Sequence, residues 1–444
     1  MAGPMLDVRT LKGFRDQLPP EMGPRRAMLQ AIEAVFRRHG FAPIDTPALE
    51  YAEILTGKYG EEGDKLLYQF EDNGGRKVAM RYDLTVPLAR FVAQHQALLP
   101  SPFRRYHIGP VWRADKPQRG RFREFVQCDA DLCGHNSALA DAEVLVVGLE
   151  VLQALQVDGA RIHVNHRGVL TALIAAAGVD PAAAPVAIRA IDKLDKIGPD
   201  GVVAELERTL ACSPATAREV LSVFAEARDL ASLEAVLVRA GVDAEVRAAS
   251  VGRLRAVFEL VAAAGHGDRL FFDASIARGL DYYTGIIYET RLTDPKVAAI
   301  GAVMSGGRYD DLIGSFGKTQ VPAVGISLGL DRLQAALREL GLCGDGRFGA
   351  DAFVVAIDEA DAVAAMALAT DLRRAGVSAE LSTRGGKIGK QLESGDKRGC
   401  RVALLVGGNE RARGEVAIKD FASGGQQVVS LSQAAETVAG LLRV

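Results

Sequence analysis

The 444-residue sequence predicts an α+β fold: an antiparallel sheet forms the core, a helical insertion interrupts it and a small α/β domain follows. Three observations support this prediction. Residues 103–134 form two alternating runs joined by a polar loop with Pro and Gly, which indicates an antiparallel hairpin. Residues 168–267 are rich in Ala, Val and Leu at helical spacing. From residue 350 onward, strand and helix patterns alternate, as in a small α/β domain.

Composition and charge are those of a globular protein, with 48% hydrophobic residues, 25% charged residues and a formal net charge of −3. The length suits roughly two to four domains. Without a strong positive charge, the chain does not resemble proteins that coat nucleic acid, although contact through a local basic patch stays open. We expect a discontinuous core domain at residues 1–167 and 268–340, interrupted by a helical insertion at 168–267. A Gly-rich linker at 341–349 should then lead to an α/β domain at 350–444.

Cysteine usage and apolar runs bear on the compartment. Five scattered cysteines, an odd number, favour a reduced cytoplasmic protein. The first residues contain no apolar core, and no run reaches about 18 apolar residues, so we expect neither a signal peptide nor a membrane span. Cys128, Cys133 and His135 match no standard zinc spacing, and we expect no metal site.

The N-terminal elements follow from periodicity. A helix is predicted from about Pro24 to His39, because apolar residues recur on one face. A strand that ends at a proline is expected within residues 41–50. Strands at 66–70 and 78–82 flank a Gly-containing turn, and a helix then runs to about Leu99.

Asp83 and Thr85 stand two residues apart after this turn. On a strand they would point to the same side and could offer a carboxylate and a hydroxyl to an ammonium group. An equally good local alternative is that they cap the helix that follows.

Later elements are predicted in the same way. A helix is expected at 138–155 and a strand at 159–166. Helices of the insertion are expected at 188–198, 202–210, 214–225, 233–241 and 246–264. The core resumes at 270–273 and closes with a strand, a Gly-rich turn and a helix over 321–340. The last domain should hold strands at 353–357, 378–381, 401–406, 415–419 and 427–431 and helices at 361–375, 387–398 and 433–442.

The hairpin is rich in guanidinium groups, at Arg113, Arg119, Arg121 and Arg123. These planar, permanently charged groups suit a polyphosphate. For any single arginine, a cross-strand salt bridge on a solvated face is the better interpretation. The whole pattern favours a ligand, because carboxylates at Asp129 and Asp131 follow on the second strand.

The order of these residues resembles motif 2 of the class II aminoacyl-tRNA synthetases. The sequence has Arg113-x-Asp115, a loop and then Arg121-x-x-x-Phe125-x-x-x-Asp129. Asp115 replaces the usual Glu.

Further stretches strengthen the resemblance. Residues 24–50 resemble motif 1, and 325–332 resemble motif 3, with Ser327 where a central Gly is often found. Four short sequences are similar to those of histidyl-tRNA synthetases. They are YHIGPVWR, RYDLTVPLAR, RGLDYYTG and SGGRYD, at residues 106–113, 81–90, 278–285 and 305–310. The resemblance covers nearly the whole chain and implies a class II catalytic core with a class IIa anticodon-binding domain.

The resemblance implies a histidine–tRNA ligase that uses ATP with bound Mg²⁺, L-histidine and tRNA-His, and that forms a homodimer through motif 1. Arg113 and Arg278 would be catalytic, at the α-phosphate. The ATP-binding set would be Arg113, Arg121, Gly325, Gly329 and Arg332, with the two glycines leaving room for adenine. The histidine-binding set would be Asp83, Thr85, Gln127, Asp131, Arg278, Tyr282, Tyr283 and Tyr309. The loop that meets the tRNA acceptor end would contain Lys116, Gln118 and Arg119.

Two alternatives compete with this interpretation. One is a non-catalytic paralogue, the regulatory subunit of ATP phosphoribosyltransferase, which lacks the anticodon domain and degrades the arginine set. The other is a class IIa synthetase for proline, threonine or glycine, which RGLDYYTG and SGGRYD disfavour. Asp131 is one methylene shorter than the Glu often found in the family, which leaves the contact to the imidazole open.

Overall fold

The computed structural model describes residues 7–277, 282–343, 349–383 and 386–442. The chain divides into two compact units, one of residues 1–16 with 28–342 and one of residues 17–27 with 343–444. The first helix, α1 (Pro19–Arg38), begins earlier than predicted. Among the described helices, none combines the length and the apolar character that a membrane crossing requires.

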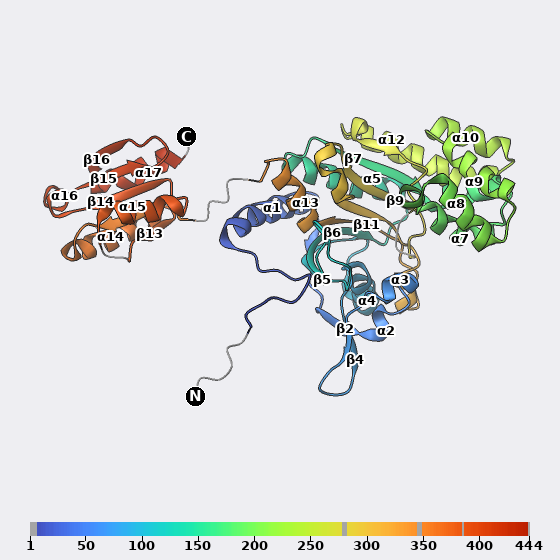
Figure 1. The fold of residues 1–444 in the computed structure, drawn as a ribbon, viewed down its shortest axis with the longest axis horizontal. Helices are drawn as coiled ribbons and strands as arrows, with labels where there is room; N and C mark the ends of the chain where they lie inside the picture. The colour runs from blue at the N-terminus through green and yellow to red at the C-terminus, as the bar shows by residue number, and fades with distance from the viewer. Residues whose placement is uncertain (1–6, 278–281, 344–348, 384–385, 443–444) are drawn as a thin grey trace. The chain divides into compact units, whose positions relative to one another are not determined.

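A mixed sheet organises the described part of the larger unit (Figure 1). Its eight strands run in the order β1-β5-β6-β11-β10-β9-β7-β8, with parallel pairs at both edges and antiparallel pairs between them. In that order the strands are Ala42–Pro43, Phe103–Trp112, Glu124–Cys133, Ala323–Gly329, Met304–Arg308, Ile286–Leu292, Ala160–His166 and Leu270–Phe272. The antiparallel core that the sequence predicted is confirmed.

The predicted hairpin supplies the second and third strands of this sheet. β5 and β6 pair from Phe103 opposite Cys133 to Trp112 opposite Glu124, and β6 then pairs with β11. On one face, α5 (Ala138–Ala154) packs closely, because a side chain at Gly148 would collide with Met304 and Ile326. Alternation along the strands therefore places Gln127, Asp129 and Asp131 on the opposite face.

A second, three-stranded sheet lies in the order β2-β4-β3, with strands Leu49–Tyr51, Lys77–Met80 and Gln69–Glu71. The strand expected to end at a proline within residues 41–50 corresponds to β1, which ends at Pro43, whereas β2 belongs to the second sheet. Pro43 and Pro47 lack the amide hydrogens that a continuous strand would contribute to both neighbours. Short helices α2 (Ala52–Leu55) and α3 (Gly60–Asp64) follow, and α4 (Thr85–His95) succeeds β4.

The insertion is helical, as predicted, and its helices gather beside the β7–β9 side of the sheet (Figure 1). They are α6 to α12, at Arg167–Ala176, Ala184–Ile191, Leu194–Leu210, Pro214–Glu226, Leu230–Arg239, Ala244–Arg247 and Arg253–Ala263. The helix expected at 188–198 is divided between α7 and α8, but the stop predicted at Gly198 is borne out. α7 ends at Ile191, and Gly198 interrupts α8 with φ 69° and ψ 175° immediately before Pro199. Glycine tolerates this conformation, and proline suits the first turn of the renewed helix.

After the insertion, the larger unit ends with α13 (Leu330–Glu339). The described part of the smaller unit is an α/β domain with strand order β13-β12-β14-β15-β16, at Ala379–Leu381, Ala352–Ala356, Val402–Val406, Glu415–Asp420 and Gln426–Ser430. Its helices are α14 to α17, at Ala362–Arg374, Ile388–Lys397, Gly408–Arg413 and Ala434–Leu442. Apolar clusters on both faces of the sheet confirm the predicted α/β character. The short helix α16 was not predicted.

Candidate functional site

A pocket opens on the sheet face opposite α5, at the loop end of the hairpin. Its cavity volume is about 90 Å³. Residues from β6, the hairpin loop, β10, β11 and the start of α13 line it, including Arg113, Asp115, Gly120, Arg121, Phe122, Phe125, Gln127, Ser305, Ser327, Gly329, Asp331 and Arg332. The structure thus brings together most of the residues that the sequence assigned to ATP.

Arg113 is held rigidly at the wall of this pocket. Its Nε donates to the Tyr82 carbonyl at 3.0 Å. The guanidinium lies 4.2 Å from the centroid of the Tyr82 ring and 5.1 Å from that of Phe125. Contact with two aromatic faces fixes the plane of a cation at little entropic cost during binding.

Arg121 and Arg332 complete a cluster of positive charge. Arg332 donates from Nη1 to the Ala302 carbonyl at 2.9 Å. Burial, together with the charges of Arg121 and Arg113, lowers the pKa of Arg332 to about 10. Like charges gathered in a pocket repel one another until an anion enters, so the cluster suits a polyphosphate.

The glycines of the site have different neighbours. Gly329 lines the pocket, as expected for a position near a bound base. Gly325 does not have the expected open space beside it, because a side chain there would collide with the Asp131 carboxylate. Likewise, a Cβ at Gly307 would come 2.9 Å from Cδ1 of Tyr283. Gly325 and Gly307 therefore make room for the protein's own side chains.

Gln127 extends the site from the pocket into the sheet. It is buried, and its Nε2 donates to Ser327 Oγ at 2.5 Å across the β6–β11 pair. Its Oε1 is also buried and lacks a hydrogen-bond partner in the described chain. A buried acceptor without a donor is costly, so this oxygen favours a ligand that carries N–H groups.

Asp83 lies at the start of α4, and it is 1% exposed. It accepts hydrogen bonds from the hydroxyls of Tyr59 at 3.1 Å and Tyr282 at 3.0 Å, and from the Val86 amide at 3.0 Å. Thr85 is the first residue of α4 and Leu84 is its N-cap, so the expected strand over Asp83 and Thr85 is wrong, and of the two only Asp83 bonds to an amide of the first turn. The carboxylate satisfies an amide of the first turn that has no partner within the helix.

The electrostatics of Asp83 connect it to the pocket. Burial raises the pKa of its carboxyl, while its hydrogen bonds and the charge of Arg113 oppose the rise. The amino-acid and nucleotide candidates are thus neighbours in space, although their motifs lie far apart in the sequence.

Asp131 is enclosed by protein groups. Its Oδ2 lies 2.7 Å from Nη2 of Arg105, a fully buried side chain on β5. Its Oδ1 accepts a hydrogen bond from the hydroxyl of Tyr309, which is also buried. Sequence reasoning missed Arg105, although it lies opposite Asp131 in the register of the hairpin. The strict alternation of the predicted strands could have paired the two.

Aromatic side chains surround these acids. The Tyr282 ring lies 5.0 Å from Tyr283 and 5.9 Å from Tyr309, both edge to face. This arrangement is typical of stable aromatic clusters. Arg278, which the sequence assigned to both the catalytic and the histidine-binding sets, lies outside the described residues.

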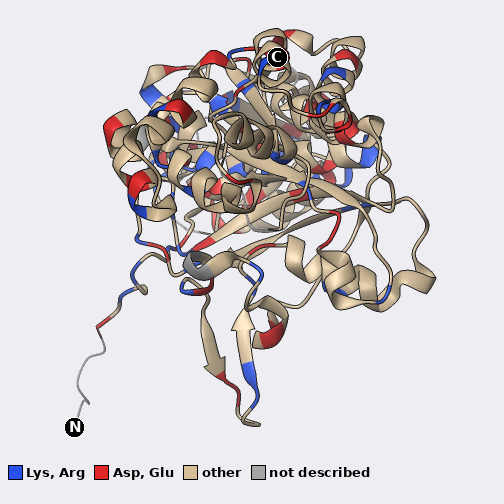
Figure 2. Ribbon diagram, turned by 90° about the vertical axis from the view of Figure 1, so that its right-hand side faces the viewer, with Lys and Arg blue, Asp and Glu red and all other residues tan. Residues whose placement is uncertain are grey.

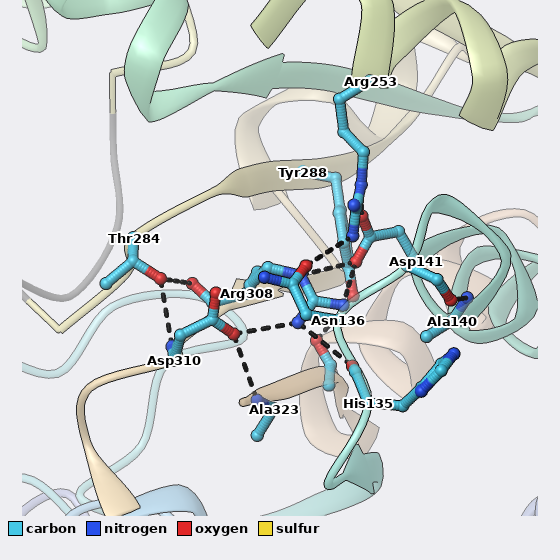
Figure 3. A network of polar contacts seen from close by, with 12 residues as sticks. His135, Asn136, Ala140, Asp141, Arg253, Thr284, Tyr288, Arg308, Asp310 and Ala323 are labelled. Atoms are coloured by element: carbon cyan, nitrogen blue, oxygen red, sulfur yellow. Dashed lines mark hydrogen bonds and ion pairs between the residues drawn. The ribbon is translucent and has the colours of Figure 1, made fainter. Parts of the chain in front are cut away.

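A buried ionic network supports the strand that leads to Tyr309 (Figure 3). Arg308 contacts Asp141 Oδ1 through Nε at 2.9 Å and Nη2 at 2.6 Å, and Arg253 of α12 contacts Oδ2 at 2.7 Å. Arg308 also donates to Asp310, whose amide bonds to Thr284. Sequence reasoning missed this network, which ties α5, β10 and the insertion together.

The loop assigned to the tRNA acceptor end is a tight turn. Gln118 and Arg121 exchange backbone hydrogen bonds of 3.1 and 2.9 Å. Lys116, Gln118 and Arg119 are exposed, and Arg119 forms an ion pair with Glu339. Across the ribbon, acidic and basic residues are interspersed, in keeping with the small net charge (Figure 2).

Comparisons with known proteins agree with this geometry. The family model for histidyl-tRNA synthetase matches residues 13–333, and the model for an anticodon binding domain matches residues 351–441. The chain is 46% identical over 429 residues to a histidine–tRNA ligase from Rhodopirellula baltica, covering 96% of both chains. It is 42% identical to the one from Aeropyrum pernix, covering 98% of both.

Solved structures are similar as well. The crystal structure of histidyl-tRNA synthetase from Nostoc sp. PCC 7120 matches with a TM-score of 0.86 and 31% identity, covering 98% of this chain and 100% of that one. An ATP phosphoribosyltransferase regulatory subunit/histidyl-tRNA synthetase from Bacillus halodurans has a TM-score of 0.75 at 21% identity and shares the fold. From its sequence and its fold, the chain belongs to the histidyl-tRNA synthetase family.

Proposed function

We propose that the chain is a histidine–tRNA ligase, which activates L-histidine with ATP and transfers it to the 3′ end of tRNA-His. The observation that carries this proposal is the convergence of Arg113, Arg121 and Arg332 on one pocket, with the buried acids Asp83 and Asp131 nearby. Cations for a polyphosphate and acceptors for a zwitterion are the two requirements of amino-acid activation. Relatives over nearly the full length are histidine–tRNA ligases.

In the first step, the histidine carboxylate attacks the α-phosphorus of ATP, the bond to the bridging oxygen breaks, and pyrophosphate leaves. Arg113, oriented by Tyr82 and Phe125, would stabilise the negative charge that builds on the α-phosphate. Arg121 and Arg332 would hold the β- and γ-phosphates. Arg278 would assist at the α-phosphate, as in the sequence prediction. Positioning and charge stabilisation carry such a transfer without a covalent enzyme intermediate.

Magnesium would reach the site with the nucleotide. Within the described parts of the chain, no three His, Cys, Asp or Glu side chains form a group that could hold a metal ion. Mg²⁺ usually keeps several waters and is bound by substrate phosphates with one or two carboxylates, so the proposal requires no such group. Its charge would add to that of the arginines.

The histidine site is proposed to lie deeper in the sheet. Asp83, Thr85 and the unpartnered Oε1 of Gln127 would meet the α-amino group. Asp131, with Tyr282, Tyr283 and Tyr309 around it, would bind the imidazole. The ribose hydroxyl at the tRNA 3′ end would then attack the carbonyl of the adenylate and release AMP.

Further parts have proposed roles in handling tRNA. The exposed loop of Lys116, Gln118 and Arg119 would meet the acceptor end, and residues 350–444 would bind the anticodon. Residues 1–167 with 268–340 would form the catalytic domain, and 168–267 the insertion. A homodimer built on α1 and β1, and a cytoplasmic location, complete the proposal.

Histidine-dependent exchange between pyrophosphate and ATP tests the activity. Histidine should support exchange, whereas proline, threonine and glycine should not. Charging of tRNA-His should follow in the same preparation. A chain that binds histidine without exchange would contradict the proposal and would favour a regulatory paralogue instead.

A further inference from the structure

A buried arginine lies behind the carboxylate that would contact the histidine ring. Arg105 is 0% exposed, and its Nη2 lies 2.7 Å from Oδ2 of Asp131. The other oxygen of Asp131 accepts from the Tyr309 hydroxyl. Because Arg105 is fully buried, it would act on a ligand through the groups around it, and Asp131 is its ion-pair partner.

Among the titratable groups around Asp131, Arg105 is the one that supplies a positive charge. The other titratable groups that act on Asp131 or share its surroundings are Asp83, Asp129, Cys133, Tyr283, Tyr288 and Tyr309. Each of these side chains is neutral when protonated and negative when deprotonated, so none of them can supply a positive charge to Asp131. His107, next along the same face of β5, is buried, and its pKa is lowered to about 3, so it is neutral near pH 7. Burial raises the pKa of Asp131, and the positive charge of Arg105 opposes that rise.

We propose that Arg105 is a positioning residue that holds Asp131 in the ionised form, so that the pocket selects a ring able to donate an N–H. This inference rests on the proposed function, in which Asp131 meets the imidazole. An ionised carboxylate only accepts hydrogen bonds, whereas a protonated one also donates. The guanidinium charge also balances that of Asp131, so a neutral imidazole completes the site without adding net charge.

The consequence is a specific pattern of discrimination. Histidine offers a ring N–H to Asp131. The analogue β-(2-thiazolyl)alanine has a similar ring whose nitrogen accepts but carries no hydrogen. A buried acceptor that receives no donor is left unpaired, and such sites reject the incomplete analogue strongly. If Asp131 became protonated, it could donate to the thiazole nitrogen, and the discrimination would weaken.

The test compares kcat/KM in pyrophosphate exchange for histidine and for β-(2-thiazolyl)alanine. The full-length protein should prefer histidine by about 10⁴-fold. Arg105→Met should lower kcat/KM for histidine and reduce the preference for histidine by at least about tenfold, because Asp131 would no longer be held as an ionised acceptor. Arg105→Lys keeps the positive charge and should keep the preference. The matched control is Arg104→Met, because Arg104 lies on the opposite face of β5 and pairs with Glu143.

Other outcomes would contradict the inference. If Arg105→Met lowers both values equally, Arg105 is merely structural. Folding is followed by the fluorescence of Trp112, the single tryptophan of the chain, which lies on the same strand. Should the methionine variant unfold, Arg105→Gln retains the donor groups without the charge and carries the same prediction. If the unaltered protein shows no histidine-dependent exchange, the proposed function itself fails, whereas an unchanged preference in the variants removes only this inference.

Discussion

The arginine-lined pocket proposed for ATP and the surroundings of Asp131 proposed for histidine lie on one face of the same sheet, but their charges are balanced differently. In the pocket, Arg113, Arg121 and Arg332 crowd together, and the charges of the first two help to lower the pKa of Arg332. In the histidine site, Asp131 is matched by Arg105 and Tyr309 within the protein. In the pocket, like charges repel one another until an anionic ligand neutralises them. Around Asp131, the protein itself supplies the opposite charge before any ligand binds. Substitutions in the two regions should therefore differ in what they damage.

Asp131→Ala should have the largest effect. It removes the partner of a fully buried arginine, which costs about 3–5 kcal/mol of folding free energy. We also expect the histidine KM to rise while the ATP KM stays unchanged. Denaturant unfolding followed by Trp112 fluorescence measures the stability, and exchange kinetics measure the KM values. Unchanged stability together with an unchanged histidine KM would contradict both roles of Asp131.

Arg113→Ala should damage the rate and spare the fold. Losing one group that stabilises transition-state charge costs about 3–4 kcal/mol, or 10²–10³-fold in kcat. Because Arg113 also lowers the pKa of Arg332, its removal relieves repulsion and should offset part of the lost packing. Pyrophosphate exchange and thermal unfolding measure the two quantities. Arg119→Ala, on the exposed part of the same hairpin, should leave exchange intact, and loss of exchange in that control would contradict the assignment.

Asp129 should make the stability of the larger unit depend on pH. Burial raises its pKa to about 8, whereas in the unfolded chain it titrates near its ordinary value. The folded state therefore binds more protons, and its stability should fall as pH rises from about 4 to about 8, by at most about 1.4 kcal/mol per pH unit. Asp129→Asn cannot titrate and should flatten this dependence. Identical slopes in both proteins, measured by unfolding at several pH values, would show that Asp129 is ionised in the fold.

Arg253→Met should have the smallest effect. Arg253 is partly exposed, and Asp141 keeps its two contacts to Arg308 when Arg253 is lost. We expect a loss of about 1 kcal/mol in stability and an unchanged histidine KM. Arg308→Met should cost more, because it leaves the buried Asp141 with only the outer partner. Equal losses in thermal unfolding would contradict this ranking.

Much of the fold followed from patterns that are local in sequence. Alternation over the hairpin predicted β5 and β6, and helical spacing predicted α5 and α12. One error arose where hydrogen bonding outweighed periodicity. Asp83 accepts a hydrogen bond from the Val86 amide at the start of α4, where a strand was expected. The helix expected at 188–198 was divided between α7 and α8, whereas the break at Gly198 agrees with the prediction.

The candidate site was also predictable from the sequence only in part. By itself, the sequence determined the residue types of the pocket, because the order of arginines and glycines in the hairpin and in residues 325–332 is distinctive. Only the tertiary structure decided which charges neutralise one another. Arg105 reaches Asp131 across the hairpin, and Arg253 reaches Asp141 from α12. Such pairs depend on strand register and helix packing, because the strength of an ionic contact is set by distance and burial, neither of which is written in the spacing of residues along a chain.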